Sequence, residues 1–199
     1  MKSLKTYIQE KLIIKKKKYK YFPKTKKELQ DIILQRIKAE GNEVDLNDID
    51  VSNITDMSNL FEYLDFNGNI SKWDVSNVTD MRYMFNGCES FNQDISRWDV
   101  SNVIDMNCMF GECRHFNGDI SKWDVSNVKD MKYMFYWCRS FNKDISKWDV
   151  SSVKYMQCMF LGCINFNQDI SVWDVSNVTT FINTFSNCKI EEKYKPKFK

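Results

Sequence analysis

The segment ISRWDVSNVIDMNCMFGECRHFNGD, residues 95–119, is one copy of a unit that recurs along most of the chain. Its Trp-Asp-Val-Ser block returns every 25 residues, and a phenylalanine column and a cysteine column keep the same register. The repeated tryptophans are Trp73, Trp98, Trp123, Trp148 and Trp173, and the repeated cysteines are Cys88, Cys113, Cys138, Cys163 and Cys188. A fixed period of this length is typical of proteins built from stacked repeats.

A degenerate copy precedes these units and begins near Leu46. Its residues 49–53, IDVSN, match the Trp-Asp-Val-Ser-Asn block with an offset of 24, so one residue is missing from the loop 62–65. The sequence therefore predicts about six coils of 24–25 residues, with atypical first and last coils because the ends face solvent or a cap.

Two different periodicities share each unit. Residues 97–101 alternate between polar and apolar, which predicts a short strand with one buried face. The apolar residues of 106–113 fall at i, i+3, i+4 and i+7, which predicts one face of a helix. Stacked strands lie about 4.8 Å apart and helices about 8–10 Å apart. The expected fold is therefore an α/β repeat solenoid with a parallel sheet on its concave side.

The repeated motif WDVSNVTDMxxMFxxCxxFNxDISKW resembles the BspA-type leucine-rich-repeat family of bacterial surface proteins, which includes the DUF285 repeats of mycoplasmas. The resemblance covers roughly residues 44–188. It implies a leucine-rich-repeat solenoid, often on a cell surface and sometimes adhesive. Adhesive members of the family carry export signals or anchors.

Three regions are expected: a basic N-terminal arm with a capping helix over residues 1–44, the solenoid over 45–190, and a charged tail over 191–199. Residues 25–28, TKKE, form a capping box, and an apolar stripe follows it, which predicts a helix from about 26 to 40 that ends at Gly41. A further short helix is expected over residues 3–14, followed by a charged connector over 15–20.

Charge is unevenly distributed. The chain has a formal net charge of +2, but residues 1–27 contain eleven lysines and one glutamate, so the remainder carries a net −8. The basic arm could contact nucleic acid or an anionic surface, but a solvated arm or a capping strand is the favoured interpretation. No stretch approaches the ~20 apolar residues of a transmembrane segment. Because no signal peptide or anchor is visible, we expect a cytoplasmic or virion-associated protein rather than a secreted one.

The seven cysteines could suggest a metal site or disulfides. Local pairs occur only five residues apart, and there is a single histidine, whereas zinc sites use closer pairs. We therefore predict a buried cysteine column, no metal and no cofactor. Two cysteines alternate with tyrosines at one repeat position, which indicates either a 50-residue duplication unit or a tolerant, half-exposed position. These residues are Tyr83, Cys108, Tyr133 and Cys158.

The outward positions of the predicted strands are charged. The basic column is Lys72, Arg97, Lys122 and Lys147, and the acidic column is Asp74, Asp99, Asp124, Asp149 and Asp174. Three interpretations are open: the basic column neutralises the acidic one, the two form a protein-binding surface, or the aspartates bind a cation such as calcium. We interpret the tryptophan column as core rather than as a stacking platform for bases or sugars.

No nucleophile–base–acid set and no phosphate-binding loop can be found, so no catalytic residue and no enzymatic activity are predicted. The favoured function is a scaffold that binds a protein partner through the concave face or through variable positions of the predicted helices. The alternative is a structural spacer, associated with a virion or an envelope and docked by its basic arm. The variable positions include Arg82, Asn107, Lys132, Gln157, Asn86, Tyr136 and Leu161.

Overall fold

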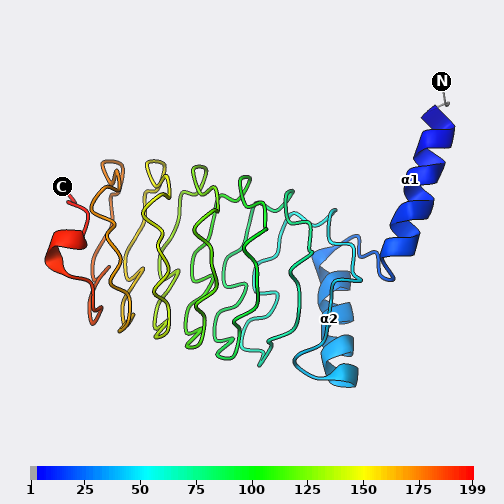
Figure 1. Cartoon of the computed structure of the whole chain (residues 1–199), viewed down its shortest axis with the longest axis horizontal. Helices are drawn as coiled ribbons and strands as arrows, with labels where there is room; N and C mark the ends of the chain where they lie inside the picture. The colour runs from blue at the N-terminus through cyan, green and yellow to red at the C-terminus, as the bar shows by residue number, and fades with distance from the viewer. Residues whose placement is uncertain (1–3) are drawn as a thin grey trace.

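The computed structural model describes residues 4–199, apart from the side chains of residues 5, 6, 9, 10 and 15–17. The element order is α1 (Leu4–Lys18), α2 (Lys26–Glu40) and, near the C-terminus, the short 3₁₀ helix η1 (Glu192–Tyr194). Between α2 and η1 the chain winds into coils that stack along the long axis of the molecule (Figure 1). Helix α2 covers one end of the stack, and α1 projects away from that end.

Helix α2 has the bounds that the sequence predicts, because its caps are explicit. The Thr25 hydroxyl accepts a hydrogen bond from the Glu28 N–H at 3.2 Å. At the other end Gly41 has a φ of +89°, a conformation that glycine adopts without strain. Leu29 and Ile33 are fully buried and belong to the same core as the coils. The helix therefore covers the open apolar end of the first coil.

Helix α1 differs from the short helix and connector that the sequence predicts. A single helix runs from Leu4 to Lys18, so most of the lysine run is helical rather than a connector. The chain is then fixed to the first coil, where Tyr21 forms a parallel bridge with Ile49. The Lys20 N–H also donates to the Asp48 carbonyl at 2.7 Å. The base of α1 is thus anchored to the stack.

The predicted leucine-rich-repeat architecture is wrong in its central feature. Within residues 4–199 there is no β-sheet and no strand longer than an isolated bridge. Single parallel bridges join each coil to the next, and they lie in the segments predicted to be helical. The bridged residues are Asp56, Asp80, Asp105, Asp130, Tyr155 and Thr180. The α/β solenoid with a concave parallel sheet is therefore not formed.

The segments predicted as helices are runs of tight turns, which we call the bridged segments: 56–63, 80–87, 105–112, 130–137 and 155–162. Every second N–H group of residues 81–87 donates to a carbonyl of the next coil at 2.8–3.0 Å. The N–H groups of Met84 and Asn86 instead bond to carbonyls three residues back. Tyr83, which directly precedes Met84, has a φ of +56°. Consecutive turns thus bury the same apolar positions as a helix would.

The segments predicted as strands are extended links between turns. The Trp98 N–H bonds to the Ile95 carbonyl, and the Val103 N–H bonds to the Val100 carbonyl, both within the same coil. No backbone hydrogen bond between residues 95 and 103 reaches a neighbouring coil. Side chains make that connection instead, as in the bond of 2.7 Å from the Asn102 amide to the Ser76 carbonyl. Without backbone pairing, these links do not form a sheet.

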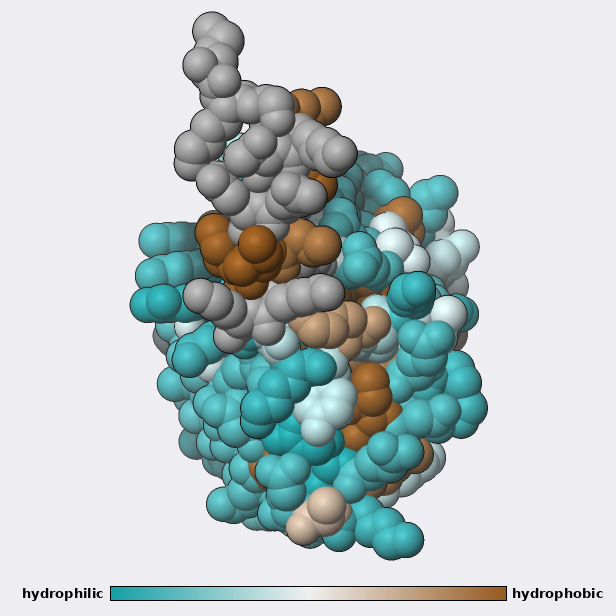
Figure 2. Space-filling view, turned by 90° about the vertical axis from the view of Figure 1, so that its right-hand side faces the viewer, coloured by the Kyte–Doolittle hydropathy of each residue, from teal (hydrophilic) through white to brown (hydrophobic). Residues whose placement is uncertain are grey.

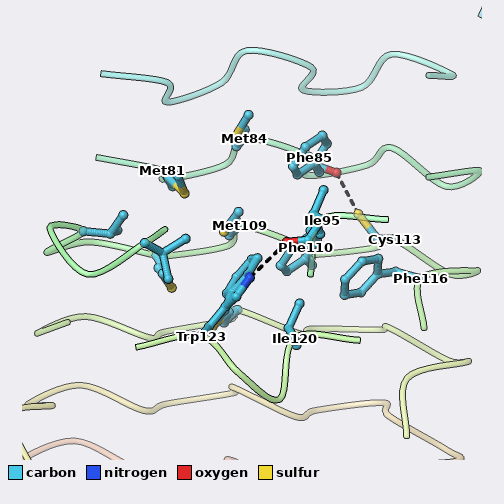
Figure 3. Close-up of a cluster of buried hydrophobic side chains, with 14 of the residues drawn as sticks. Met81, Met84, Phe85, Ile95, Met109, Phe110, Cys113, Phe116, Ile120 and Trp123 are labelled. Carbon is cyan, nitrogen blue, oxygen red and sulfur yellow. Dashed lines mark hydrogen bonds between the residues drawn. The ribbon is translucent and has the colours of Figure 1, made fainter. Parts of the chain in front are cut away.

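Columns of stacked aromatic rings run through the core. The main column is formed by Phe61, Phe85, Phe110, Phe135, Phe160 and Phe185, with ring centroids 5.3–5.8 Å apart. A second column lies beside it and includes Phe116, at 4.1 Å from Phe110 (Figure 3). No single coil can bury such side chains, so the coils are stable only when stacked.

The C-terminal segment, interpreted from sequence as a charged tail, packs against the last coil. Phe198 stacks on Phe181 with ring centroids 4.4 Å apart, and the Tyr194 carbonyl accepts the Ile170 N–H at 3.0 Å. This segment covers the end of the stack opposite α2 (Figure 1).

Candidate functional site

The tryptophan and cysteine columns lie inside the stack. The five repeated tryptophans are only 4–6% exposed, and each indole N–H donates to a carbonyl of the preceding coil at 2.9–3.2 Å. The cysteine thiols bond likewise to phenylalanine carbonyls, as Cys113 does to Phe85 at 2.9 Å (Figure 3). Burial raises the pKa of the Cys88 thiol to about 12 and that of Cys113 well above its usual value. All seven cysteines are free thiols.

The basic and acidic columns are exposed, and we call their surface the Lys/Asp face. Each aspartate accepts a hydrogen bond from the backbone N–H of the serine two residues later, at 3.1 Å for Asp99 and Ser101. Hydrogen bonding by that serine lowers the pKa of Asp99, and the same is true of Asp149 and Asp174. The aspartates of this column therefore hold local turns.

The charge neutralisation expected on the Lys/Asp face is not made by ion pairs. Among the residues that the structure describes, no ion pair joins Lys72, Arg97, Lys122 or Lys147 to an aspartate of the neighbouring column. Nor do three or more histidine, cysteine, aspartate or glutamate side chains of residues 4–199 gather as a metal-binding group.

Ion pairs instead follow the bridged segments, whose outer surface we call the bridged face. Arg82 pairs with Asp80 at 2.7 Å and reaches Asp105 at 3.7 Å. Lys132 pairs with Asp130 at 2.9 Å. In the coil of Asp105 the position equivalent to Arg82 and Lys132 holds the uncharged Asn107, and burial raises the pKa of Asp105, with Asp130 adding to the effect. Acidic side chains of neighbouring coils are thus neutralised here by cations in every second coil.

The tyrosine–cysteine alternation lies on the same face. Tyr83, Cys108, Tyr133 and Cys158 all have left-handed backbone conformations, with φ of 53–57°. Burial, followed by the neighbouring Cys108 thiol, raises the pKa of Tyr83, and the Cys158 thiol is the largest cause of the raised pKa of Tyr133. Each tyrosine therefore lies against the cysteine of the following coil.

The bridged face contains one aromatic cluster, formed by Tyr133, Tyr136 and Trp137. The Tyr136 ring makes edge-on contacts with Tyr133 at 5.8 Å and with Trp137 at 6.3 Å between centroids. The Arg139 guanidinium lies 4.9 Å from the centroid of the Trp137 ring. All three aromatic side chains remain half-exposed. We call these three residues and Arg139 the aromatic patch.

The neighbouring coils make room for the aromatic patch. A Cβ on Gly162 would lie 2.8 Å from the Trp137 ring, so the tryptophan packs over a glycine of the next coil. On the other side a shallow hollow of about 290 Å³ is lined by Glu112, Arg114, Tyr136, Trp137 and Arg139. The patch thus combines aromatic surface with an adjoining hollow and two arginines.

A family model described as "Mycoplasma protein of unknown function, DUF285" matches residues 30–138 and 119–195 of the chain. The chain belongs to the DUF285 family. The resemblance inferred from the repeat motif is therefore confirmed at the level of this family. No curated protein and no solved structure matches the chain.

The two matched ranges of this DUF285 protein cover the coils and most of α2 but leave out α1. Within residues 4–199, none of the helices combines the length and the apolar character that crossing a bilayer requires. The repeat family therefore describes the stack, and α1 has to be interpreted from its own residues.

Trp137 is the residue of the site that sequence reasoning missed. Tyr136 was recognised as a variable position, but the sixth tryptophan lies outside the 25-residue column and was not singled out. The available signal was the departure of YW at 136–137 from NG at 86–87 in the DUF285 repeat. The structure adds that both aromatic side chains reach the surface.

Proposed function

We propose that this DUF285 chain is a non-enzymatic repeat protein that binds a protein partner through the bridged face, with the aromatic patch as the centre of the interface. The observation that carries the proposal is the half-exposed cluster of Tyr133, Tyr136 and Trp137 in a single coil. Tyrosine, tryptophan and arginine are the residues enriched among those that dominate binding energy at protein interfaces.

The way in which the coils are joined supports the bridged face. There, backbone groups connect successive coils, so side chains can vary without loss of the connection. Positions equivalent to Tyr136 hold Asn86, Gly111 and Leu161, which differ in size and polarity. Variation on a rigid frame is suited to recognition.

The chemistry of the patch favours a partner segment with an apolar or aromatic anchor and a nearby carboxylate. Such an anchor would contact Tyr136 and Trp137, and a carboxylate could pair with Arg139, whose side chain is exposed.

The test replaces residues of the aromatic patch by those found at the equivalent positions of another coil. Tyr136→Asn with Trp137→Gly installs the pair found at Asn86 and Gly87, and Trp137 already has a φ of +54°, which glycine adopts readily. We therefore expect this double variant to fold. The matched control replaces Arg97, Lys122 and Lys147 by Glu on the Lys/Asp face.

Proteins retained by the wild-type chain from a lysate of its source would be identified, purified and titrated against each variant. The proposal predicts a loss of affinity of more than about tenfold for the double variant, as expected for a residue central to an interface. The control should bind within about threefold of wild type at physiological salt. Loss of binding only in the control would show that the partner binds the Lys/Asp face, and it would overturn the proposal.

A further inference from the structure

Helix α1 places large apolar side chains in water. Six of its residues are between 51 and 75% exposed, and none of its residues belongs to the core of the stack. These residues are Leu4, Tyr7, Ile8, Leu12, Ile13 and Ile14. Figure 2 shows hydrophobic surface on the protruding part of the molecule, above a largely hydrophilic body. Exposed apolar area of this extent normally marks a surface that is covered in function.

The charge of α1 is concentrated toward its C-terminal end rather than on one side of the helix. The apolar residues lie within positions 4–14, together with Lys5, Glu10 and Lys11, whereas positions 15–18 are all lysine. The whole helix contains six lysines and one glutamate, a formal net charge of +5. An apolar segment that ends in a cluster of positive charge matches the boundary between acyl chains and anionic headgroups.

Other occupants fit α1 less well. A nucleic acid would pair with the lysines but would leave the six apolar side chains in water. A second copy of α1 would bring another helix of charge +5 against the first, which is repulsive. An anionic bilayer accommodates both the apolar and the basic residues, and a helix of 15 residues, about 22 Å long, is too short to cross it.

The rest of the molecule also favours this arrangement. The base of α1 is held to the first coil by Tyr21 and Lys20, the latter pairing with Asp48 at 3.3 Å. Residues 28–199 carry a net charge of −8, so an anionic surface repels the stack while it attracts the helix.

We propose that α1 is a docking helix that enters the interface of an anionic lipid bilayer from its N-terminal end, with its apolar side chains among the acyl chains and the lysines of positions 15–18 at the headgroups. Docking in this way holds the coil stack away from the lipid and leaves the bridged face accessible. This inference concerns a second surface and does not depend on the function proposed for the aromatic patch.

The experiment measures flotation of the full chain with vesicles of phosphatidylcholine alone or with about one third phosphatidylglycerol. Two variants are compared: Leu12, Ile13 and Ile14 replaced together by Gln, and Lys15 to Lys18 replaced together by Gln. Because α1 contributes nothing to the core, both variants should keep the unfolding midpoint of the wild-type chain.

We expect wild type to float with the anionic vesicles and not with the neutral ones. Each variant should lose at least about tenfold in partitioning to the anionic vesicles. No flotation of the wild-type chain with anionic vesicles would overturn the proposal. So would full flotation of the Leu12–Ile14 variant, or binding to a single-stranded RNA that is tighter than vesicle binding and unaffected by that variant.

Discussion

Each coil is joined to the next by backbone hydrogen bonds in the bridged segments and by side-chain hydrogen bonds in the segments around the repeated tryptophans. In the bridged segments, backbone N–H groups donate to backbone carbonyls of the next coil, whatever side chain is attached. In the segments around the tryptophans, the connection is made by side chains such as the Trp98 indole and the Asn102 amide. Side-chain connections require particular residues, whereas backbone connections do not. The difference explains why the tryptophan segment is repeated almost unchanged while the bridged segment varies.

The largest effect is expected where a side chain both fills the core and connects two coils. Trp123→Ala should reduce the free energy of unfolding by about 3–5 kcal/mol, because it opens a cavity and removes one of the two hydrogen bonds that the Ile95 carbonyl accepts, the one that joins the two coils. Urea denaturation measures the loss. Trp123→Phe keeps most of the volume and should cost less than the alanine. A cost below about 1 kcal/mol for the alanine would mean that the indole does not connect the coils.

An intermediate effect is expected in the column of asparagines. The Asn117 side-chain oxygen accepts the Asn142 N–H at 3.0 Å, and the Asn117 N–H donates to Asn92 in the same way at 2.8 Å. Asn117→Ala should cost about 1–2 kcal/mol in the same denaturation experiment, because a backbone donor loses its acceptor. Asn117→Asp, which retains an acceptor oxygen, should recover part of the loss. Equal costs for both would show that the acceptor is unimportant.

A smaller loss of stability is expected when acid protonates the aspartates that hold the Asp–Ser turns. Serine hydrogen bonds lower the pKa of Asp94, Asp99, Asp119, Asp144 and Asp149 in the folded chain. Their contribution to stability is present above the unfolded value of about 3.9 and is lost as pH falls through the lowered folded values.

Asp105 acts in the opposite sense, since its raised pKa favours the folded state below about pH 4 and loses that contribution as pH rises. Because the aspartates with a lowered pKa outnumber Asp105, the thermal unfolding midpoint should decrease as the pH is lowered from 4 to 2. An unchanged midpoint across that range would contradict the role assigned to the turns.

The smallest effect is expected on the bridged face. Lys132→Asn installs the residue found at Asn107 and should change the free energy of unfolding by less than about 1 kcal/mol, the usual range of an exposed ion pair. Lys122→Ala, on the Lys/Asp face, provides a baseline without an ion pair. If Lys132→Asn costs as much as Asn117→Ala under the same conditions, the two kinds of connection do not differ as described.

The sequence predicted the period, the number of coils and the bounds of α2, because each depends on residue spacing or on an explicit cap. It failed on the strand and the helix within each coil. Apolar residues at i, i+3, i+4 and i+7 are also buried by consecutive turns, provided that residues such as Tyr83 and Cys108 adopt positive φ. A single sequence gives no sign of that conformation in residues other than glycine.

The candidate site was predictable only in part, because residue spacing does not show which contacts an outward side chain makes. Spacing identifies which residues are outside, as it did for Lys122 and Asp124, but not which outward residues are already used by a turn. The aspartates proved to be bonded to their own serines. The aromatic patch depends on contacts between Tyr136 and Trp137 and on the space above Gly162, which become visible only in three dimensions.

The pairing of tyrosine with cysteine limits how such an array can lengthen in evolution. Insertion of fifty residues, equivalent to the distance from Tyr83 to Tyr133, preserves a tyrosine beside a cysteine at every junction between the coils that carry Tyr83 to Cys158. Insertion of twenty-five residues would place two tyrosines or two cysteines side by side. It would also place two coils with a cation, such as Arg82 or Lys132, next to each other, or two coils that lack one. Unequal recombination within the reading frame therefore adds coils most readily in twos.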